Sequence, residues 1–316
     1  MYESLRAHSY EFKLFIFAFD DMSYQILKEL NLQNVTIISL GEFETSELLE
    51  IKQVRSKAEY CWTCTPSILN HVLQNYDVKN CTYLDSDLIF YSDPSVLIEE
   101  MIEHHKNVLI TEHRYSPLAK FYEEKRAGRF CVQFVTFTKE ANSLEILDKW
   151  RLQCIDWCYA RHEEGKFGDQ KYLDEWPLIY NNIHILEHPG GGVAPWNLLQ
   201  YQFKENQNFI EGVVKKTGSE FKMVFFHFQY VKFLENCSYD IGWYLIPPII
   251  KKIFYLPYLK KIEELENEII TLNPNYRKSY TRFKADSIKN LLKIVFKETF
   301  GYNIIKKNEN GFSSKS

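Results

Sequence analysis

The amino-acid sequence predicts an α/β protein built on a parallel or mixed β-sheet. Apolar runs of strand length alternate along the chain with helical patterns, which is the order typical of such sheets. The 316 residues suffice for a sizeable α/β domain with an appendage, or for two domains. A hydrophobic fraction of 45% and a charged fraction of 25% are ordinary for folded proteins, so general disorder is excluded.

The first half of the chain supplies most of the predicted sheet. Runs rich in β-branched and aromatic residues predict strands, apolar residues at helical spacing predict helices, and Asp93-Pro94 opens a helix. In chain order we expect a strand at residues 12–19, a helix at 23–30, a strand at 35–40, a helix at 57–74, a strand through 83–91, a helix after 94, and strands at 108–111 and 130–137.

The strand through residues 83–91 carries two carboxylates spaced one residue apart, Asp85 and Asp87. Alternate residues of an extended chain point to the same side, so both carboxylates can face one point. Two carboxylates facing one point can coordinate a hard divalent ion such as Mn2+ or Mg2+, and proteins commonly bind a nucleotide diphosphate through such an ion. The alternative is that these acids merely end a strand, since Asp and Ser are common in turns.

The second half of the chain is less regular. A helix is predicted at residues 140–159, followed by Phe167-Gly168-Asp169-Gln170 and a strand at 182–186. The loop at residues 188–197 contains three consecutive glycines between two prolines, which marks unusual turns or close backbone approach. A surface loop and an active-site loop fit this pattern equally well. A strand at 222–226 then delivers His227, whose ordinary role would be that of a core histidine.

These motifs together resemble the GT-A glycosyltransferases, and most closely the retaining, nucleotide-sugar-dependent family 8 and its bacterial relatives. The resemblance covers residues 12–235, and the D-x-D is its most specific part. It implies that Asp85, Asp87 and His227 hold Mn2+ or Mg2+, that Lys232 contacts the donor diphosphate, and that Asp169 and Gln170 lie at the donor sugar. Together with the glycine-rich loop, it makes these the predicted donor-binding residues: Asp85, Ser86, Asp87, Lys232, Trp196 and Asn197.

The sequence departs from the family pattern at several positions. Tyr230 stands where the family usually has glycine, and Lys232 is one residue closer to the histidine than usual. Cys131 replaces an asparagine that contacts sugar in relatives, and the arginine expected on the helix before the D-x-D is missing, with Arg55 as the nearest substitute.

The largest departure is at the start of the sequence. The family opens with a strand that holds the nucleobase, whereas Met1 falls within what resembles the first helix. We therefore expect a GT-A, Rossmann-like mixed sheet that lacks its first strand, and the hypothesis is a truncated reading frame.

The chain from Trp243 onward differs electrostatically from the rest, with 14 basic against 7 acidic residues, compared with 24 against 35 before it. We predict a catalytic domain at residues 1–242 and a basic helical extension at 243–316. In the extension, an apolar face (Ile288, Leu291, Leu292, Val295, Phe296 and Phe300) opposes Lys289, Lys293 and Lys297. This face either packs on the protein or lies on an anionic membrane surface.

The predicted function is therefore transfer of a sugar from a nucleotide-sugar donor, with UDP as the expected nucleotide, to a glycan or lipid-linked acceptor in cell-surface polysaccharide or lipopolysaccharide synthesis. Two alternatives stay open: a haloacid-dehalogenase-type phosphatase using Asp85, Asp87, Asp169 and Asp174, and a catalytically silent membrane-surface or binding protein. In the phosphatase pattern, Ile89 would be Thr or Val. No nucleic-acid partner is expected.

Compartment and redox state follow from simpler features. No run of 18 apolar residues exists, and the start of the sequence lacks a secretory signal. Seven cysteines, with one C-x-x-C at Cys61 and Cys64 and no second pair at zinc spacing, indicate reduced thiols. We expect a cytoplasmic protein, peripheral at the inner face of the cell membrane.

Overall fold

The computed structural model describes residues 1–316 except 10, 208, 236–237, 282–286, 309–310 and 315–316. The chain divides into two compact units, Met1–His227 and Phe228–Ser316, which we call unit 1 and unit 2 and treat separately. The sequence-based boundary after residue 242 falls within unit 2, and the extent of the catalytic domain stays a prediction.

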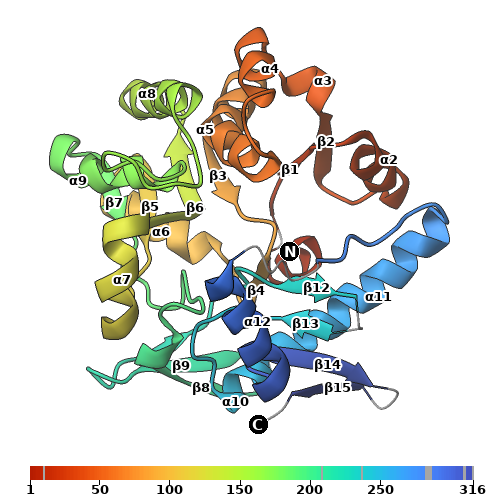
Figure 1. Cartoon of the computed structure of the whole chain (residues 1–316). Coiled ribbons are helices and arrows are strands. Elements are labelled where there is room, and N and C mark those ends of the chain that lie inside the picture. Colours follow the sequence, from red (N-terminus) through yellow and green to blue (C-terminus); the bar gives the residue numbers. More distant parts are fainter. Residues whose placement is uncertain (10, 208, 236–237, 282–286, 309–310, 315–316) are drawn as a thin grey trace. The chain divides into compact units, whose positions relative to one another are not determined.

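Unit 1 contains a four-stranded sheet in the order β3-β6-β5-β7 (Figure 1). β3 (Asn80–Leu84) and β5 (Val108–Glu112) run antiparallel to β6 (Phe130–Thr138), and β7 (Ile183–Ile185) runs parallel to β5. β6 is rich in β-branched and aromatic residues, and all of its residues except the last are buried. This burial is expected of a central strand covered on both faces. The prediction of a mixed α/β fold is confirmed.

The predicted single sheet is divided into several sheets among the described residues. Besides the four-stranded sheet, unit 1 has a parallel pair, an antiparallel pair and an antiparallel three-stranded sheet. These are β1 (Leu14–Ala18) with β2 (Val35–Ser39), β4 (Leu88–Phe90) with β11 (Phe225–His227), and β8 (Tyr201–Glu205) with β9 (Ile210–Val214) and β10 (Glu220–Lys222). The three-stranded sheet was not predicted from the sequence.

Helices α2, α3, α4 and α5 begin at polar side-chain caps. α5 starts with a capping box in which the Ser56 and Glu59 side chains accept from each other's backbone N–H groups. The Asp20 side chain caps the start of α2 by accepting from the Ser23 N–H. The helical segments are α1 (Tyr2–His8), α2 (Asp21–Leu30), α3 (Leu40–Phe43), α4 (Ser46–Lys52), α5 (Lys57–Asn75), α6 (Ser95–Glu103), α7 (Pro117–Ala127), α8 (Ala141–Asp156), η1 (Gln170–Glu175), α9 (Trp176–Ile179) and η2 (Leu198–Gln200).

An aromatic cluster ties the large sheet to the segment that carries Asp169. Trp150 of α8 stacks on Phe137 of β6 and meets Trp176 edge-on, with ring centroids 6.2 and 5.3 Å apart. Its indole N–H donates to the backbone carbonyl of Asp169 at 2.9 Å. Burial of the core therefore fixes the backbone at a predicted site residue.

Unit 2 combines an antiparallel sheet with helices. The sheet has the order β12 (Lys232–Leu234), β13 (Ser238–Asp240), β14 (Ile304–Asn308) and β15 (Gly311–Ser314). The helices are α10 (Pro248–Ile250), the π-helical η3 (Lys251–Tyr255), α11 (Leu256–Leu272) and α12 (Ile288–Phe300). The predicted helices are present, but the extension is not only helical, because β14 and β15 follow α12.

The predicted basic face of α12 needs one correction. Lys297 does not face solvent: its ammonium group is fully buried, pairs with Asp240 and donates to the carbonyl of Gly242. Burying a charge is tolerated only with such partners, so Lys297 anchors α12 to β13. Lys293 is exposed, and the side chains of Ile288 and Lys289 lie outside the described part of the chain.

The apolar face of α12 is exposed at five positions. Between 43% and 65% of the accessible area is exposed for Leu291, Leu292, Val295, Phe296 and Phe300. None of the described helices is long and apolar enough to cross a bilayer.

Candidate metal and donor site

The two aspartates of the D-x-D lie in a turn rather than in a strand. The chain leaves the large sheet after Leu84, turns through Asp85, Ser86 and Asp87, and enters β4 in a different sheet. The Asp85 N–H still donates to the Gln133 carbonyl at 3.2 Å, which fixes the start of the turn. The acids do converge as predicted, but a turn between two sheets brings them together instead of strand alternation.

His227 completes a group of three possible metal ligands. It ends β11, which pairs with β4 so that His227 lies opposite Leu88, the residue after Asp87. The His227 Nε2 atom is 3.0 Å from Asp87 Oδ1 and 3.6 Å from Asp85 Oδ2. One ligand atom from each residue lies within 4.8 Å of the other two. The structure therefore brings together the three residues predicted to hold a metal.

Gln133 of β6 orients the histidine ring. Its Oε1 lies 2.7 Å from His227 Nδ1, and both side chains are buried. Because an amide oxygen can only accept, Nδ1 must donate the proton, and the Nε2 lone pair of the neutral ring is left to face Asp85 and Asp87. A fixed partner on the far ring nitrogen is typical of metal-ligating histidines.

The glycine-rich loop is buried and supports His227. The His227 N–H donates to the Val193 carbonyl at 2.9 Å. Gly192 has φ of +88°, and a Cβ there would lie 2.7 Å from Thr111 Cγ2 and 3.1 Å from Gln133 Nε2. Only glycine fits that backbone and that space. Of the two open interpretations, a surface loop is excluded.

Trp196 and Asn197 close this loop in different ways. The Trp196 ring meets the His227 ring edge-on, with centroids 5.4 Å apart. Asn197 is fully buried; its Oδ1 accepts from the Ala194 N–H, and its Nδ2 donates to the carbonyls of His113 and Gly192. These bonds show Asn197 holding the loop, and donor contact by either residue stays a prediction.

Burial and charge together shift the pKa values of the three candidate ligands. Burial, with help from Asp87, raises the pKa of Asp85. Burial alone would raise the pKa of Asp87, but the His227 ring holds it below its usual value. Burial alone would lower the pKa of His227, but Asp87 and Asp85 hold it well above the usual value. Carboxylates held this close repel each other, so the cluster favours a cation.

A third carboxyl group, that of Asp169, is influenced by the charge of Asp85. Burial and this charge raise the pKa of Asp169 to about 7, although hydrogen bonding opposes the rise. Tyr83 of β3 supports the D-x-D, because its hydroxyl donates to Asp85 Oδ1 at 3.1 Å.

Gln170 follows Asp169 at the start of η1. Its side-chain N–H donates to the Ala127 carbonyl at the end of α7. The amide nitrogen is thereby used, and the amide oxygen is the group left for the predicted role at the donor sugar.

Three residues were discussed above as departures from the family pattern, and the structure shows what each of them contacts or which backbone conformation it has. Arg55 is buried and donates to Thr63 and to the carbonyls of Ile155 and Cys158, so it has a structural task. In unit 2, the Lys232 ammonium lies 4.3 Å from the centre of the Tyr230 ring, and its contact with a diphosphate stays a prediction. Tyr230 has φ of +79°, a conformation that favours glycine, which is the residue expected there from the family resemblance.

Two supporting residues were not predicted from the sequence. Gln133 carried a signal, because it is an amide in a buried strand whose other residues are aromatic, valine, cysteine and threonine. Tyr83 carried none, because tyrosine is common in strands. Cys131, singled out as a departure from the family, is buried in β6; burial raises the pKa of its thiol, and the His227 ring opposes this rise.

Replacing Gln133 by leucine is expected to weaken Mn2+ binding by about 10- to 100-fold, as for other residues that orient a metal ligand. The change removes the acceptor for His227 Nδ1–H and leaves the ring free to turn. Isothermal titration with Mn2+ measures the effect, and Gln202→Leu on the exposed side of β8 is the control. Equal Mn2+ affinity in both variants would show that Gln133 only fills space.

Asp169→Asn is expected to change how stability depends on pH. A folded-state pKa of about 7, against 3.8 ordinarily, means that the native protein holds this proton more tightly than the unfolded chain. Stability should then fall as pH rises from about 4 to about 7, by at most about 4 kcal/mol. Calorimetry with EDTA should show Asp169→Asn gaining more in Tm over the parent at pH 8 than at pH 5. If the curves of Tm against pH for the variant and the parent were parallel, Asp169 would not have the raised pKa.

Comparisons with known proteins give distant relatives. No protein-family model matches the chain. It is 29% identical to the uncharacterized protein YfnD of Bacillus subtilis (strain 168) over 283 residues, covering 87% of this chain and 88% of YfnD. It is 28% identical to the uncharacterized protein YfnF of the same organism over 234 residues, covering 72% and 75%.

Among solved structures, mouse xyloside xylosyltransferase 1 in its apo form is similar with a TM-score of 0.39 and 16% identity, covering 61% of this chain and 78% of that protein. A197 from STIV is similar with a TM-score of 0.26 and 10% identity, covering 67% and 94%.

Proposed function

We propose that this chain is a metal-dependent glycosyltransferase that moves a sugar from a nucleotide-sugar donor, expected to be a UDP-sugar, to a glycan or lipid-linked acceptor. The observation that carries the proposal is the convergence of Asp85, Asp87 and His227 at one point. A hard divalent ion held by few protein ligands keeps positions for phosphate oxygens, as nucleotide sites require. The D-x-D, the Asp169-Gln170 pair and the late histidine are the motifs that resemble family 8.

The residues present fit a divalent cation. Two carboxylates and one neutral imidazole supply its oxygen and nitrogen ligands, and Gln133 already directs the Nε2 lone pair toward the carboxylates. When bound, Mn2+ or Mg2+ supplies positive charge that stabilises a departing diphosphate. Ser86 is exposed at the centre of the turn, and its hydroxyl is free to contact the donor.

Asp169 and Gln170 have different tasks in the proposed reaction. In a retaining course, the acceptor hydroxyl attacks from the face that the diphosphate leaves and gives its proton to a leaving phosphate oxygen, while the Gln170 amide oxygen stabilises the cationic sugar carbon. In an inverting course, Asp169 takes the acceptor proton. A general base is most effective when its pKa is close to the working pH, and about 7 for Asp169 fits that role.

The test is turnover of a panel of nucleotide sugars with Mn2+, read as release of the free nucleotide. Transfer to an added acceptor, with the anomeric configuration of the product read by NMR, separates retaining from inverting chemistry. A phosphatase would instead release phosphate from p-nitrophenyl phosphate, and a binding protein would do neither. Asp174 already pairs with Lys171 and accepts from the Arg129 backbone, which leaves it poorly suited to phosphatase chemistry.

We further propose that the enzyme works on cell-surface polysaccharide or lipopolysaccharide precursors at the cytoplasmic face of the membrane. Support comes from unit 2, where the exposed apolar residues of α12 adjoin aromatic neighbours. Phe296 contacts Phe300 and Tyr302, Tyr302 stacks on Trp243, and the Lys293 ammonium lies 5.6 Å from the centre of the Trp243 ring. Exposed aromatics beside lysine suit the interface of an anionic membrane.

Substituting Leu292, Phe296 and Phe300 together by glutamine is expected to release the protein from anionic liposomes in a sedimentation assay at moderate salt. The change removes exposed apolar area and leaves the fold in place. Truncating the chain after Asn275 would be a poorer test, because it removes Lys297 and β14 and leaves Asp240 buried without its partner. The control is a triple glutamine variant at the exposed residues Leu49, Leu152 and Leu178 of unit 1. Equal release of both variants would rule out α12 as the anchor.

A further inference from the structure

A row of aromatic rings begins beside Asp169 in unit 1. The indole ring of Trp62, on α5, lies against Gly168: a Cβ added at Gly168 would be 3.5 Å from Trp62 Cε3. Gly168 directly precedes Asp169 in the chain. The next ring is that of Phe167, whose centroid is 6.5 Å from that of Trp62, with the two planes tilted by 41°. Both side chains are half-buried, so each keeps a part that solvent can reach.

Helix α7 continues the row. The Arg126 guanidinium lies 5.5 Å from the centre of the Phe167 ring. Tyr122 precedes Arg126 by four residues on the same helix, so the two side chains lie on one face of it. Tyr122 exposes 66% of its accessible area. We call the set formed by Trp62, Phe167, Arg126 and Tyr122 the aromatic row.

The aromatic row borders both residues that are proposed to act at the sugar. Trp62 contacts the residue before Asp169. Ala127, the residue after Arg126, accepts a hydrogen bond from the Gln170 side chain. A molecule bound along the row therefore has one end next to the Asp169-Gln170 pair.

The packing of the fold does not require this arrangement. Exposed aromatic residues that are scattered singly are common on protein surfaces. Here three rings from three separate segments follow one another beside a buried acid: one from α5, one from the segment before η1, and one from α7. Aromatic side chains with a small number of polar groups among them are the usual lining of a ligand site.

The charge of the aromatic row is balanced. Arg126 pairs with Glu123 on the same helix, and its Nη2 and Nε atoms lie 2.5 and 3.1 Å from Glu123 Oε2. A phosphate or carboxylate would meet the guanidinium and the repelling carboxylate together. The hydroxyl groups of a neutral sugar can accept from the guanidinium and donate to the carboxylate. The charge pattern therefore favours a neutral ligand that carries hydroxyl groups.

We propose that the aromatic row binds the acceptor, and that the acceptor is an oligosaccharide of neutral sugars. One face of a pyranose ring carries mainly C–H groups, which pack on the electron-rich face of an aromatic ring. The spacings of 6.5 and 5.5 Å along the row are comparable to the width of one sugar ring, so the row supports successive sugars. This inference rests on the proposed function, in which Asp169 and Gln170 act at the transferred sugar.

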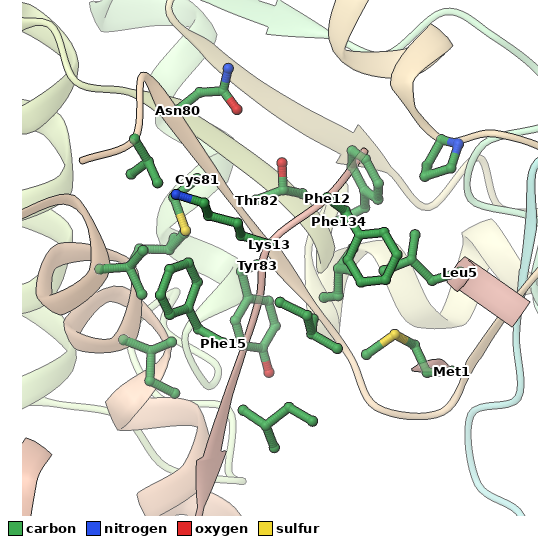
Figure 2. Close-up of a pocket in the computed structure, with 18 of the residues that line it drawn as sticks. Met1, Leu5, Phe12, Lys13, Phe15, Asn80, Cys81, Thr82, Tyr83 and Phe134 are labelled. Atoms are coloured by element: carbon green, nitrogen blue, oxygen red, sulfur yellow. The ribbon is translucent and has the colours of Figure 1, made fainter. Parts of the chain in front are cut away.

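The cavity drawn in Figure 2 is a separate feature of unit 1. It has a volume of about 640 Å³ and lies between β1 and β3, with Phe15 on one side and Cys81 and Tyr83 on the other. Its described walls contain no residue of the aromatic row and no tryptophan. A signal from Trp62 therefore distinguishes a saccharide on the row from one in the cavity.

The first experiment is fluorine NMR of the full chain labelled with fluorotryptophan, in which Trp62→Phe assigns the Trp62 resonance. The probes are maltose, cellobiose and lactose, the methyl glycosides of glucose, galactose and mannose, and a glucose phosphate. We expect the neutral disaccharides to shift the Trp62 resonance and to bind more tightly than the methyl glycosides, and the glucose phosphate to give no shift. Neither donor nor metal is present, so the result does not depend on turnover.

The second experiment measures the KM of each substrate. Trp62→Ala is expected to raise the KM for an oligosaccharide acceptor by about tenfold, which is the effect of one aromatic contact, without raising the KM for the nucleotide-sugar donor. Trp62→Phe should restore most of the acceptor affinity. The control is Phe209→Ala, because Phe209 is 39% exposed and has the Lys222 ammonium 5.9 Å from its ring centre, as Phe167 has Arg126. If Trp62→Ala does not fold, Tyr122→Ala replaces it in both experiments.

Three results would overturn the proposal. The first is that no neutral saccharide binds, and the second is that saccharides bind without shifting the Trp62 resonance, since the site would then lie elsewhere. The third is a raised donor KM with an unchanged acceptor KM in Trp62→Ala, since the row would then hold the nucleotide. Failure of the proposed function is distinguishable from these results: the parent would release no nucleotide from any nucleotide sugar, while neutral disaccharides would still shift the Trp62 resonance.

Discussion

Replacing Asp85 or Asp87 by asparagine is expected to abolish Mn2+-dependent binding of UDP, with a loss of at least about 100-fold, beyond the range seen for residues that only orient a ligand. Asparagine keeps the size of the side chain and removes the anionic oxygen that a hard cation needs. Both side chains lie in the turn between β3 and β4 and not in the packed core, so the fold should persist. Titration of UDP in the presence and absence of Mn2+ measures the effect.

Asp148→Asn is the matched control, because Asp148 is an exposed aspartate on α8 that pairs with Arg151. Circular dichroism should be the same for all three variants and the parent. If both D-x-D variants retained Mn2+-dependent UDP affinity, Asp85 and Asp87 would not be metal ligands. His227→Ala belongs to the same series: a loss of activity no greater than about twofold, far below the usual effects around metal sites, would make it a core residue.

Asp169→Ala and Gln170→Ala should still bind UDP and Mn2+ but transfer sugar poorly, with a fall in kcat of roughly 100-fold or more if Asp169 acts as the base. Asp169 is buried and is influenced by the charge of Asp85, yet it is not among the three converging residues. Its proposed task is therefore at the reacting carbon and not at the diphosphate.

Two measurements separate the roles of these residues. Nucleotide and metal affinities by titration should stay within a few-fold of the parent, whereas sugar transfer in single-turnover experiments should fall. Asp174→Ala, which alters an acid on the same 3-10 helix, is the control for local structural change. Loss of UDP binding in the Asp169 or Gln170 variants would show that these residues shape the nucleotide pocket instead.

Most strands and long helices of unit 1 could be predicted because their signals are local. β6 is rich in β-branched and aromatic residues, and α5 has a capping box and apolar residues at helical spacing. The exposed helix α7 and the hairpin of β8 and β9 were missed. α7 is mainly polar, and β8 and β9 are stabilised by pairing with each other, which a local pattern does not show.

The division into separate sheets could not be predicted for a related reason. Strand pairing depends on residues far apart in the chain, and β4 pairs with β11 across more than a hundred residues. Lys297 was misplaced because helical spacing assigns it to a polar face, whereas the partner that permits its burial, Asp240, lies on another element.

The convergence of the three candidate metal ligands was predicted from the sequence, but the physical reason given for two of them was wrong. Spacing of one residue suggested strand alternation, and the structure has a turn at Asp85 and Asp87. The identity of His227 as a partner came from the resemblance to family 8, since a histidine after an apolar strand carries no distinctive pattern. Gln133 lies close to His227 only in the folded chain, so its role becomes visible only in the structure.

The position of His227 has a consequence for synthesis of the protein on the ribosome. Asp85 and Asp87 leave the ribosome early, but His227 is the last residue of unit 1. β11, which carries His227, pairs with β4 directly after the D-x-D turn. A nascent chain therefore holds two close carboxylates without their histidine until all of unit 1 has been translated. Completion of the candidate cation site and completion of unit 1 are thus the same event during synthesis of the chain.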